Sequence, residues 1–454
     1  MMARGISAAK STKAAKTMKP SGVAWIGDIP EGWEVNFLSQ KVSQVKNRND
    51  GLKEKNLLSL SYGKIKRKSI DSIGGLLPAS FEGYNVIAAD DIVLRLTDLQ
   101  NDQHSLRIGL SRERGIVTSA YTTIRPNFQT DAIFLFYSLF AFDIGKGFYG
   151  MGSWVRHGLN YDEVKRMVVP IPPLPEQRAI ADYLDKKCAA IDAAVAEAKK
   201  GIEEYKAWKK SLIFEMVTGK NRVDDLAANN PKVAKTKPSG IPWIGDIPEG
   251  WEVSKTLHAL CMPITDGPHT TPDLFDDGIP FVSAEAVSCG NGRIDFDHIR
   301  GYISEAFYNE CSLKYIPQRD DIYMIKSGAT TGRVAIVDTD RRFTIWSPLA
   351  VFRCNLQRAK PRYVFYYLQS SAYQGQVELA WSFGTQQNIG MRALEELKVV
   401  LPSLAEQQAI ADYLDEKCAA IDALVAEKEA LIADLEAYKK SLIYETVTGK
   451  REVA

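Results

Sequence analysis

The stretch "PSGVAWIGDIPEGWEV" (Pro20–Val35) occurs a second time, almost unchanged, as "PSGIPWIGDIPEGWEV" (Pro238–Val253). Its tryptophans and the Ile-Pro-Glu-Gly turn between them are typical of a joint anchored in a core, although exposed tryptophans could also hold a ligand. Two more phrases are duplicated, both at an offset of 230 residues: Ile180–Asp192 with Ile410–Asp422, and Lys209–Lys220 with Lys439–Lys450. The chain of 454 residues therefore contains one unit twice.

The middle parts of the two copies share a pattern but little sequence. β-Branched and aromatic residues predict two strands and a buried helix in each copy. The matching segments are "DDIVLRL" (Asp90–Leu96) with "DDIYMIK" (Asp320–Lys326), "SAYTTIRP" (Ser119–Pro126) with "SPLAVFRC" (Ser347–Cys354), and "FLFYSL" (Phe134–Leu139) with "YVFYYL" (Tyr363–Leu368). The loops between them differ. One framework with two sets of loops is typical of two binding domains with different targets, although neutral divergence is the alternative.

Each copy ends in a long amphipathic helix. Apolar residues recur in steps of four and three, close to the heptad period, with Lys209, Lys428 and Lys439 as interruptions. Prolines precede each helix, and Gly219 and Gly449 are suited to its left-handed C-terminal cap. Because each apolar seam is too narrow for a globular core, we predict that the two helices pair as an antiparallel coiled coil. A homodimer through separate seams is the alternative.

These patterns predict an α+β protein with two duplicated α/β domains joined by two long helices. The expected boundaries are a flexible tail at 1–18, a first globular domain at 19–173, a first helix at 174–220, a linker at 221–237, a second domain at 238–403 and a second helix at 404–450.

Catalytic motifs are missing from the sequence. It contains no CxxC, HExxH, GxSxG or phosphate-binding P-loop, and "SGATTGR" (Ser327–Arg333) lacks the P-loop spacing and lysine. The acids Asp90/Asp91 and Asp320/Asp321 could hold a metal, but paired acids at a turn are more often solvated. No apolar run approaches the ~20 residues that cross a bilayer. The scattered cysteines indicate a reduced, cytoplasmic protein. We therefore expect a binding protein, not an enzyme.

Charge and side-chain chemistry favour DNA as the ligand. Residues 36–170 carry 18 Lys and Arg against 13 Asp and Glu, whereas residues 254–400 carry 15 against 16. Lysines neutralise phosphates, and side chains that can make two hydrogen bonds, such as Arg, Asn and Gln, recognise base edges. A solvated charged surface is the alternative. The candidate DNA contacts are Lys64, Lys66, Arg67, Lys68, Arg95, Arg107, Arg112, Arg114, Arg156 and His157 in the first domain, and Lys326, Thr330, Arg333, Gln386, Gln387 and Asn388 in the second.

Together, the duplicated phrases resemble a known family. "WIGDIPEGWEV", "PIPPLPEQRAIADYLD" with "LPSLAEQQAIADYLD", "KSGATTGRVAIV" and the two-unit layout resemble the specificity subunit of type I restriction–modification systems, over nearly the whole chain. The resemblance implies two target-recognition domains that each read half of a split site in double-stranded DNA. It also implies helices that set the half-site spacing and dock two modification methyltransferase subunits and restriction (translocase) subunits.

Adenine methylation and ATP-dependent cleavage would then belong to the partner subunits, with S-adenosylmethionine, ATP and Mg as their cofactors and none in this chain. Two alternatives stay open: a DNA-binding regulator that acts alone, and a coiled-coil scaffold that does not bind DNA.

Overall fold

A computed structural model describes residues 17–69, 80–99, 106–151, 158–223, 235–383 and 387–453. The predicted tail and linker therefore lie mostly outside the described residues. The chain divides into two compact units, Met1–Lys199 with Ala430–Ala454, and Lys200–Glu429. These units do not coincide with the two sequence copies, because each unit combines one globular domain with part of both long helices.

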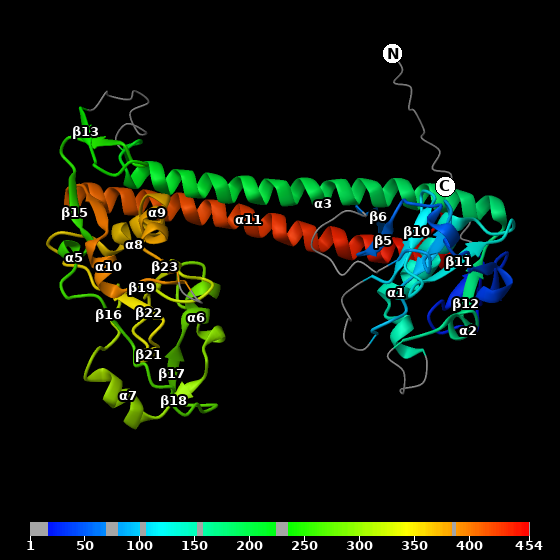
Figure 1. Ribbon diagram of the computed structural model, residues 1–454, viewed down its shortest axis with the longest axis horizontal. Helices are drawn as coiled ribbons and strands as arrows, with labels where there is room; N and C mark the ends of the chain where they lie inside the picture. The colour runs from blue at the N-terminus through cyan, green and yellow to red at the C-terminus, as the bar shows by residue number, and fades with distance from the viewer. Residues whose placement is uncertain are drawn as a thin grey trace, which may run out of the picture. The chain divides into compact units, whose positions relative to one another are not determined.

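In unit 1 the globular domain is mainly antiparallel sheet around one long buried helix (Figure 1). Its helices are α1 (Ala132–Ile144) and α2 (Tyr161–Val164), and its strands are β1 (Met18–Pro20), β2 (Asp28–Pro30), β3 (Glu34–Phe37), β4 (Val42–Val45), β5 (Leu58–Ser61), β6 (Lys64–Arg67), β7 (Asn85–Ile87), β8 (Ile92–Leu94), β9 (Ile108–Leu110), β10 (Gly115–Val117), β11 (Thr122–Pro126) and β12 (Val168–Ile171).

The domain of unit 2 carries more helix. Its helices are α5 (Thr256–Ala259), α6 (Ala284–Cys289), α7 (Glu305–Ser312), α8 (Pro361–Gln369), α9 (Ser371–Leu379) and α10 (Met391–Glu396). Its strands are β13 (Thr236–Pro238), β14 (Asp246–Pro248), β15 (Glu252–Lys255), β16 (Thr265–Asp266), β17 (Ile279–Val282), β18 (Tyr302–Ile303), β19 (Ile322–Ile325), β20 (Val334–Ile336), β21 (Thr344–Ile345), β22 (Leu349–Phe352), β23 (Ser382–Phe383), β24 (Gln387–Asn388) and β25 (Lys398–Leu401).

A four-stranded sheet with the same strand order lies in each domain. The order is β4-β11-β8-β9 in unit 1 and β16-β22-β19-β20 in unit 2. The two predicted strands of each copy pair directly, through Ile92 and Ile124 in unit 1 and through Ile322 and Phe352 in unit 2. The predicted buried helices are α1 and α8. Leu135, Leu139 and Phe142 of α1 share a core cluster with the sheet residues Ile92 and Ile124, and Tyr363 and Phe365 of α8 share one with Ile322 and Phe352. The predicted common α/β framework is therefore confirmed.

The two long helices are α3 (Leu174–Val217) and α11 (Leu404–Val447), and each contributes to both units. They run antiparallel within unit 1, because Asp192 lies 2.5 Å from Lys439 while Lys199, further along α3, lies 4.0 Å from the earlier residue Glu436. In unit 2, Lys209 pairs with Asp422 at 2.7 Å. Lys209 and Lys439, which interrupt the apolar seam in the sequence, are therefore ion-paired across it.

The duplicated tryptophan phrase forms the joint between a domain and a helix end. Trp33 and Trp251 are each only 2% exposed, which fits the anchoring role for these two, whereas Trp243 of the second phrase is 39% exposed. Trp33 packs against the turn at Gly449, the end of α11, and Trp251 packs against the turn at Gly219, the end of α3. Each domain therefore holds the end of the helix that belongs to the other sequence copy.

A buried glutamine fixes the start of each long helix to its own domain. The side chain of Gln177 accepts a hydrogen bond from the backbone N–H of Asp131 at 2.8 Å. Gln407 accepts the equivalent bond from the N–H of Lys360 at 2.7 Å. Since Asp131 and Lys360 cap α1 and α8, each domain core is tied to the first turn of the helix that follows it.

Candidate nucleic-acid interface

The basic cluster of the first domain lies on a two-stranded hairpin. Strands β5 and β6 are joined by Tyr62 and Gly63, whose φ angles of 47° and 74° give the tight turn that this hairpin needs. Lys64, Lys66 and Lys68 alternate along the exposed strand and its continuation. The side chain of Tyr62, at the tip, is 76% exposed. The hydroxyl of an exposed tyrosine beside lysines can donate to a phosphate oxygen of DNA, so Tyr62 joins the candidate residues predicted from the sequence.

Four of the predicted cations of the first domain pair with carboxylates inside unit 1. The cations are 56–73% exposed and their carboxylate partners 21–41%, so each cation remains accessible from solvent. The pairs are Lys64 with Asp192 at 3.2 Å, Arg112 with Asp185 at 2.8 Å, Arg114 with Glu54 at 3.0 Å, and Arg67 with Glu113. Hydrogen bonds from Arg67 hold the pKa of Glu113 below its ordinary value. Lys66 and Lys68 have no ion pair within the described residues.

Arg107 has a different place from the one predicted. Its side chain is fully buried, and its guanidinium donates to the backbone oxygens of Thr97 at 2.7 Å and Asp98 at 3.1 Å. It also donates to the hydroxyl of Tyr149 at 3.1 Å. These hydrogen bonds from the buried guanidinium fix the backbone of the loop after β8. Arg95 is half-buried on the neighbouring segment and shares backbone hydrogen bonding with Arg107.

The loops that carry several of the predicted DNA contacts lie at equivalent places in the two domains. An isolated bridge joins Thr97 to Gly158 in unit 1, and the corresponding bridge joins Ser327 to Asn388 in unit 2. In unit 1 the loop after β8 meets the segment before α2. In unit 2 the loop after β19 meets the segment before α10. Arg156, His157 and Gln386 lie outside the described residues. Gln387 pairs with Phe383 in a short hairpin, and Asn388 is exposed.

In the second domain, Lys326 is used internally whereas Arg333 is exposed. The side chain of Lys326 is only 12% exposed, and its ammonium lies 3.3 Å from the buried carboxylate of Asp266. Burial alone would raise the pKa of Asp266, but Lys314 at 2.5 Å, together with Lys326, lowers it below its ordinary value. Arg333 donates to the backbone oxygen of Ser288 at 2.9 Å. The backbone oxygen of Thr330 accepts from the N–H of Arg333.

Of the acids considered as metal ligands, only the second in each copy is shown with an arginine partner. In each copy the first acid, Asp90 or Asp320, turns the chain with a positive φ of 67° or 71°. The second acid is buried and accepts two hydrogen bonds from an arginine: Asp91 from Arg125 at 2.7 and 2.8 Å, and Asp321 from Arg353 at 2.7 Å for both. Within the described ranges, no group of three His, Cys, Asp or Glu side chains is placed to hold a metal ion.

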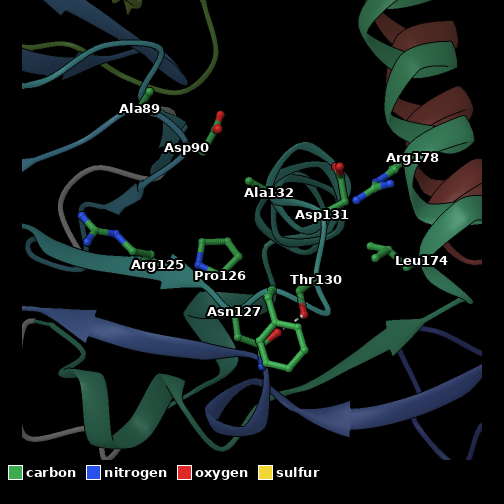
Figure 2. Close-up of a pocket in the computed structure, with 11 residues that line it drawn as sticks. Ala89, Asp90, Arg125, Pro126, Asn127, Thr130, Asp131, Ala132, Leu174 and Arg178 are labelled. Atoms are coloured by element: carbon green, nitrogen blue, oxygen red, sulfur yellow. Dashed lines mark hydrogen bonds between the residues drawn. The ribbon is translucent and has the colours of Figure 1, made fainter.

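The pairing of Asp91 with Arg125 and of Asp321 with Arg353 was not predicted from the sequence, although the acids and the arginines recur at nearly constant offsets between the two copies. In the first domain, Arg125 borders a cavity of about 300 Å³ at the foot of α1 and α3 (Figure 2). Figure 2 shows Arg178 on the helix side of this cavity and Arg125 on the strand side. Its walls come from the shared framework, so the cavity is separate from the loops that differ between the domains.

The comparisons agree with these features. A family model described as "Type I restriction modification DNA specificity domain" matches residues 248–433. A putative type I restriction enzyme specificity subunit, MjaX of Methanocaldococcus jannaschii, is 24% identical over 445 residues, which covers 94% of this chain and 96% of the relative. The EcoBI specificity subunit of Escherichia coli is 22% identical over 302 residues, covering 65% of this chain and 60% of that protein.

Two solved structures share the fold. A chain from a structural study of complex assembly and conformational transition of the type I R-M system has a TM-score of 0.62 at 19% identity, with 93% of this chain and 99% of that chain covered. The HsdS subunit from Thermoanaerobacter tengcongensis has a TM-score of 0.51 at 17% identity, with 93% and 98% covered.

Fold and relatives together point to the class of non-catalytic DNA-specificity subunits, whose DNA specificity domain is matched in this chain by residues 248–433. Over 94% of its length the chain is similar to specificity subunits of type I restriction–modification systems, which together with the matched domain supports a DNA-recognition subunit of such a system. None of the helices in the described part of the chain combines the length and apolarity needed to cross a membrane.

Proposed function

We propose that the two domains read the two halves of a split DNA sequence, and that the chain docks two modification methyltransferase subunits and the restriction subunits. The observation that carries this proposal is the pair of equivalent loop junctions, Thr97 with Gly158 and Ser327 with Asn388, on one framework with different loops. Two linked readers bind a split site far more tightly than either half, because the second contact is intramolecular.

In this proposal the chemistry belongs to the partners. S-adenosylmethionine would serve the methyltransferase subunits, and ATP and Mg the restriction subunits, in the cytoplasm. Exposed lysines such as Lys66 and Lys68 would neutralise phosphates, while side chains such as Asn388 would meet base edges. Charge reversal of Lys66 and Lys68 should therefore weaken DNA binding at every sequence.

The test is a genome-wide map of methylated adenine in the host, with and without this gene. Loss of one split motif upon deletion of the gene is the expected result. An unchanged map, in cells that express all subunits, would contradict the proposal. Binding of the purified chain to DNA without partners would then separate a regulator that acts alone from a scaffold that does not bind DNA.

We propose further that α3 and α11 set the spacing between the half-sites. Deletion of seven residues from each helix removes about 10 Å of helix and keeps the heptad phase. The preferred spacer should then change by about three base pairs, since DNA rises about 3.4 Å per pair. Selection of bound sites from a library with random spacer lengths measures this preference, and an unchanged spacer would exclude the helices as the ruler.

A further inference from the structure

We propose that a groove in unit 2, between α3 and the loop before β20, binds the phosphate backbone of DNA with lysines of the long helix. The inference rests on the proposed function and extends it, because it assigns phosphate contacts to a helix outside the recognition domain. It also explains how a domain with 15 basic against 16 acidic residues can approach a polyanion.

The groove has a volume of about 1050 Å³, which is as large as the upper range of small-molecule sites. One wall is the loop segment 331–333, which includes the predicted DNA contact Arg333. The opposite wall is α3 with Lys206, Lys209 and Lys210. The lining also includes the neutral polar side chains Ser288, Asn291, Gln369, Ser371 and Gln374 and the apolar side chains Ile213, Val287, Val334, Ile421 and Val425. Lysines together with such amide and hydroxyl groups are the usual donors to phosphate oxygens.

The loop wall is held in place by the domain. Gly332 has a φ of 91°, and a Cβ there would lie 2.4 Å from the side-chain oxygen of Gln374. The side-chain nitrogen of Gln374 donates to the backbone oxygen of Gly332 at 2.9 Å. Arg333 is fixed by its hydrogen bond to Ser288 at the same wall. A phosphate in the groove would therefore meet donors that are already ordered.

Three acids also line the groove, and two of them are engaged. Both carboxylate oxygens of Asp422 accept from Lys209 at 2.7 Å, and Glu203 lies 3.4 Å from Lys206. The third acid is Glu429. Lys210 and Arg333 have no carboxylate partner among the residues that the structure describes. The balance of free charge in the groove is positive.

The two sequence copies differ in the charge of the helix segment that lines the groove. Lys206 of α3 corresponds to Glu436 of α11, at the offset of 230. The segment 200–210 carries four lysines and two acids, whereas 430–440 carries two lysines and two acids. The lysine-rich segment belongs to unit 2, whose domain lacks excess positive charge, and the balanced segment belongs to unit 1, whose domain is basic. The helix supplies the cations that the second domain does not have.

The experiment measures the salt dependence of DNA binding by the full chain assembled with its methyltransferase subunits. The variant is Lys206→Gln with Lys210→Gln, and Lys209 is kept because it pairs across the helix seam. The matched control is Lys200→Gln, an exposed lysine of the same helix that pairs with Glu204 at 3.5 Å and does not line the groove. The DNA is a duplex with the methylated motif, and a second duplex without it.

We expect the double variant to reduce the slope of log K against log salt by about 1.8 on both duplexes, since each phosphate contact contributes about 0.9. The control should keep the wild-type slope. An unchanged slope in the double variant would overturn the groove proposal and leave the proposed function intact. Normal DNA affinity with loss of methyltransferase subunits from the complex would also overturn it, and would assign the groove to a protein partner. Absence of DNA binding by the wild-type complex would remove both proposals.

Discussion

Gly449 shows how one residue closes a joint between distant parts of the chain. Its φ of 75° ends α11 with a left-handed turn, and the N–H of Lys450 bonds to the carbonyl of Glu445 at 2.8 Å. A Cβ at Gly449 would lie 2.3 Å from the ring of Pro30. The glycine therefore serves both the helix cap and the close approach of the tryptophan phrase.

Substitution of this glycine by alanine should destabilise unit 1. The strained φ and the contact with Pro30 each cost about 1–3 kcal/mol, so Gly449→Ala should lower the free energy of unfolding by at least about 2 kcal/mol. Gly32→Ala is the control, because a Cβ there meets nothing within 4 Å. Urea unfolding measures both, and equal stabilities of the two variants would contradict the role of Gly449.

Asp143 makes unit 1 sensitive to pH. Burial raises the pKa of its carboxyl to about 6 from 3.8, although the N–H of Arg107, at 2.6 Å, acts in the opposite direction. Because the pKa is higher in the folded state, the stability that Asp143 contributes is complete below about pH 4 and is lost as pH rises through 6.

Asp143→Asn cannot ionise and can still accept the hydrogen bond from Arg107. The free energy of unfolding of the variant, relative to the wild type, should therefore increase between pH 4 and pH 7, by at most about 3 kcal/mol. Parallel urea titrations at several pH values measure this difference. A difference that does not change with pH would show that Asp143 ionises in the folded protein as it does in the unfolded chain.

At the scale of elements, the seam between the long helices carries a reciprocal pair of ion pairs. Lys209 with Asp422 and Lys439 with Asp192 occupy equivalent positions in the two copies. All four side chains are partly buried, with 21–22% exposed for the lysines and 40–41% for the acids. Polar pairs in an apolar seam favour one register over others, because any shift leaves a charge against apolar side chains.

A double-mutant cycle on Lys209→Ala and Asp422→Ala should give a coupling energy of about 1 kcal/mol, larger than that of a surface pair. The surface control is Lys200 with Glu204, four residues apart on one helix, for which about 0.3–0.5 kcal/mol is expected. Reversal of the pair, with Lys209→Asp and Asp422→Lys, should recover most of the stability. Equal coupling in the two cycles would mean that the seam pair does not specify register.

At the scale of the whole molecule, the compact units differ from the sequence copies. Unit 2 is the continuous segment Lys200–Glu429, and it contains both the Trp251 joint and the Gly219 turn that packs on it. A fragment that begins at the linker, residues 221–454, retains the second domain and all of α11 but loses Gly219 and Lys209. Its Asp422 and Trp251 are then without partners in the same chain.

The duplication predicts how this fragment would respond. In a second copy, Lys439 and Gly449 are the equivalents of Lys209 and Gly219, so two fragments can complete each other. We expect residues 221–454 to form a homodimer and residues 200–429 to be monomeric. Sedimentation equilibrium of both fragments measures this. A folded monomer of residues 221–454 would show that the second domain does not need the helix end of the first copy.

Local patterns in the sequence were sufficient for the duplicated framework, the strands β8, β11, β19 and β22, and the long helices with their glycine ends. Periodicity, β-branched residues, proline and glycine act over a few residues, so a short stretch such as "VTGK" is enough to predict where a helix ends. The same local reasoning located the lysine cluster of the hairpin, whereas the carboxylate partner of Lys64, Asp192, lies far along the chain and was not predicted.

Tertiary structure decided what depends on residues far apart in the chain. Only the fold shows that Arg107 points into the domain, that Lys326 faces Asp266, and that each tryptophan phrase holds the helix end of the other copy. The sequence lists the same lysines and arginines whether they meet a carboxylate, a carbonyl or solvent. Which of these they meet follows from packing between segments that one-dimensional patterns do not relate, and this packing separates the cations that shape the protein from those that remain exposed.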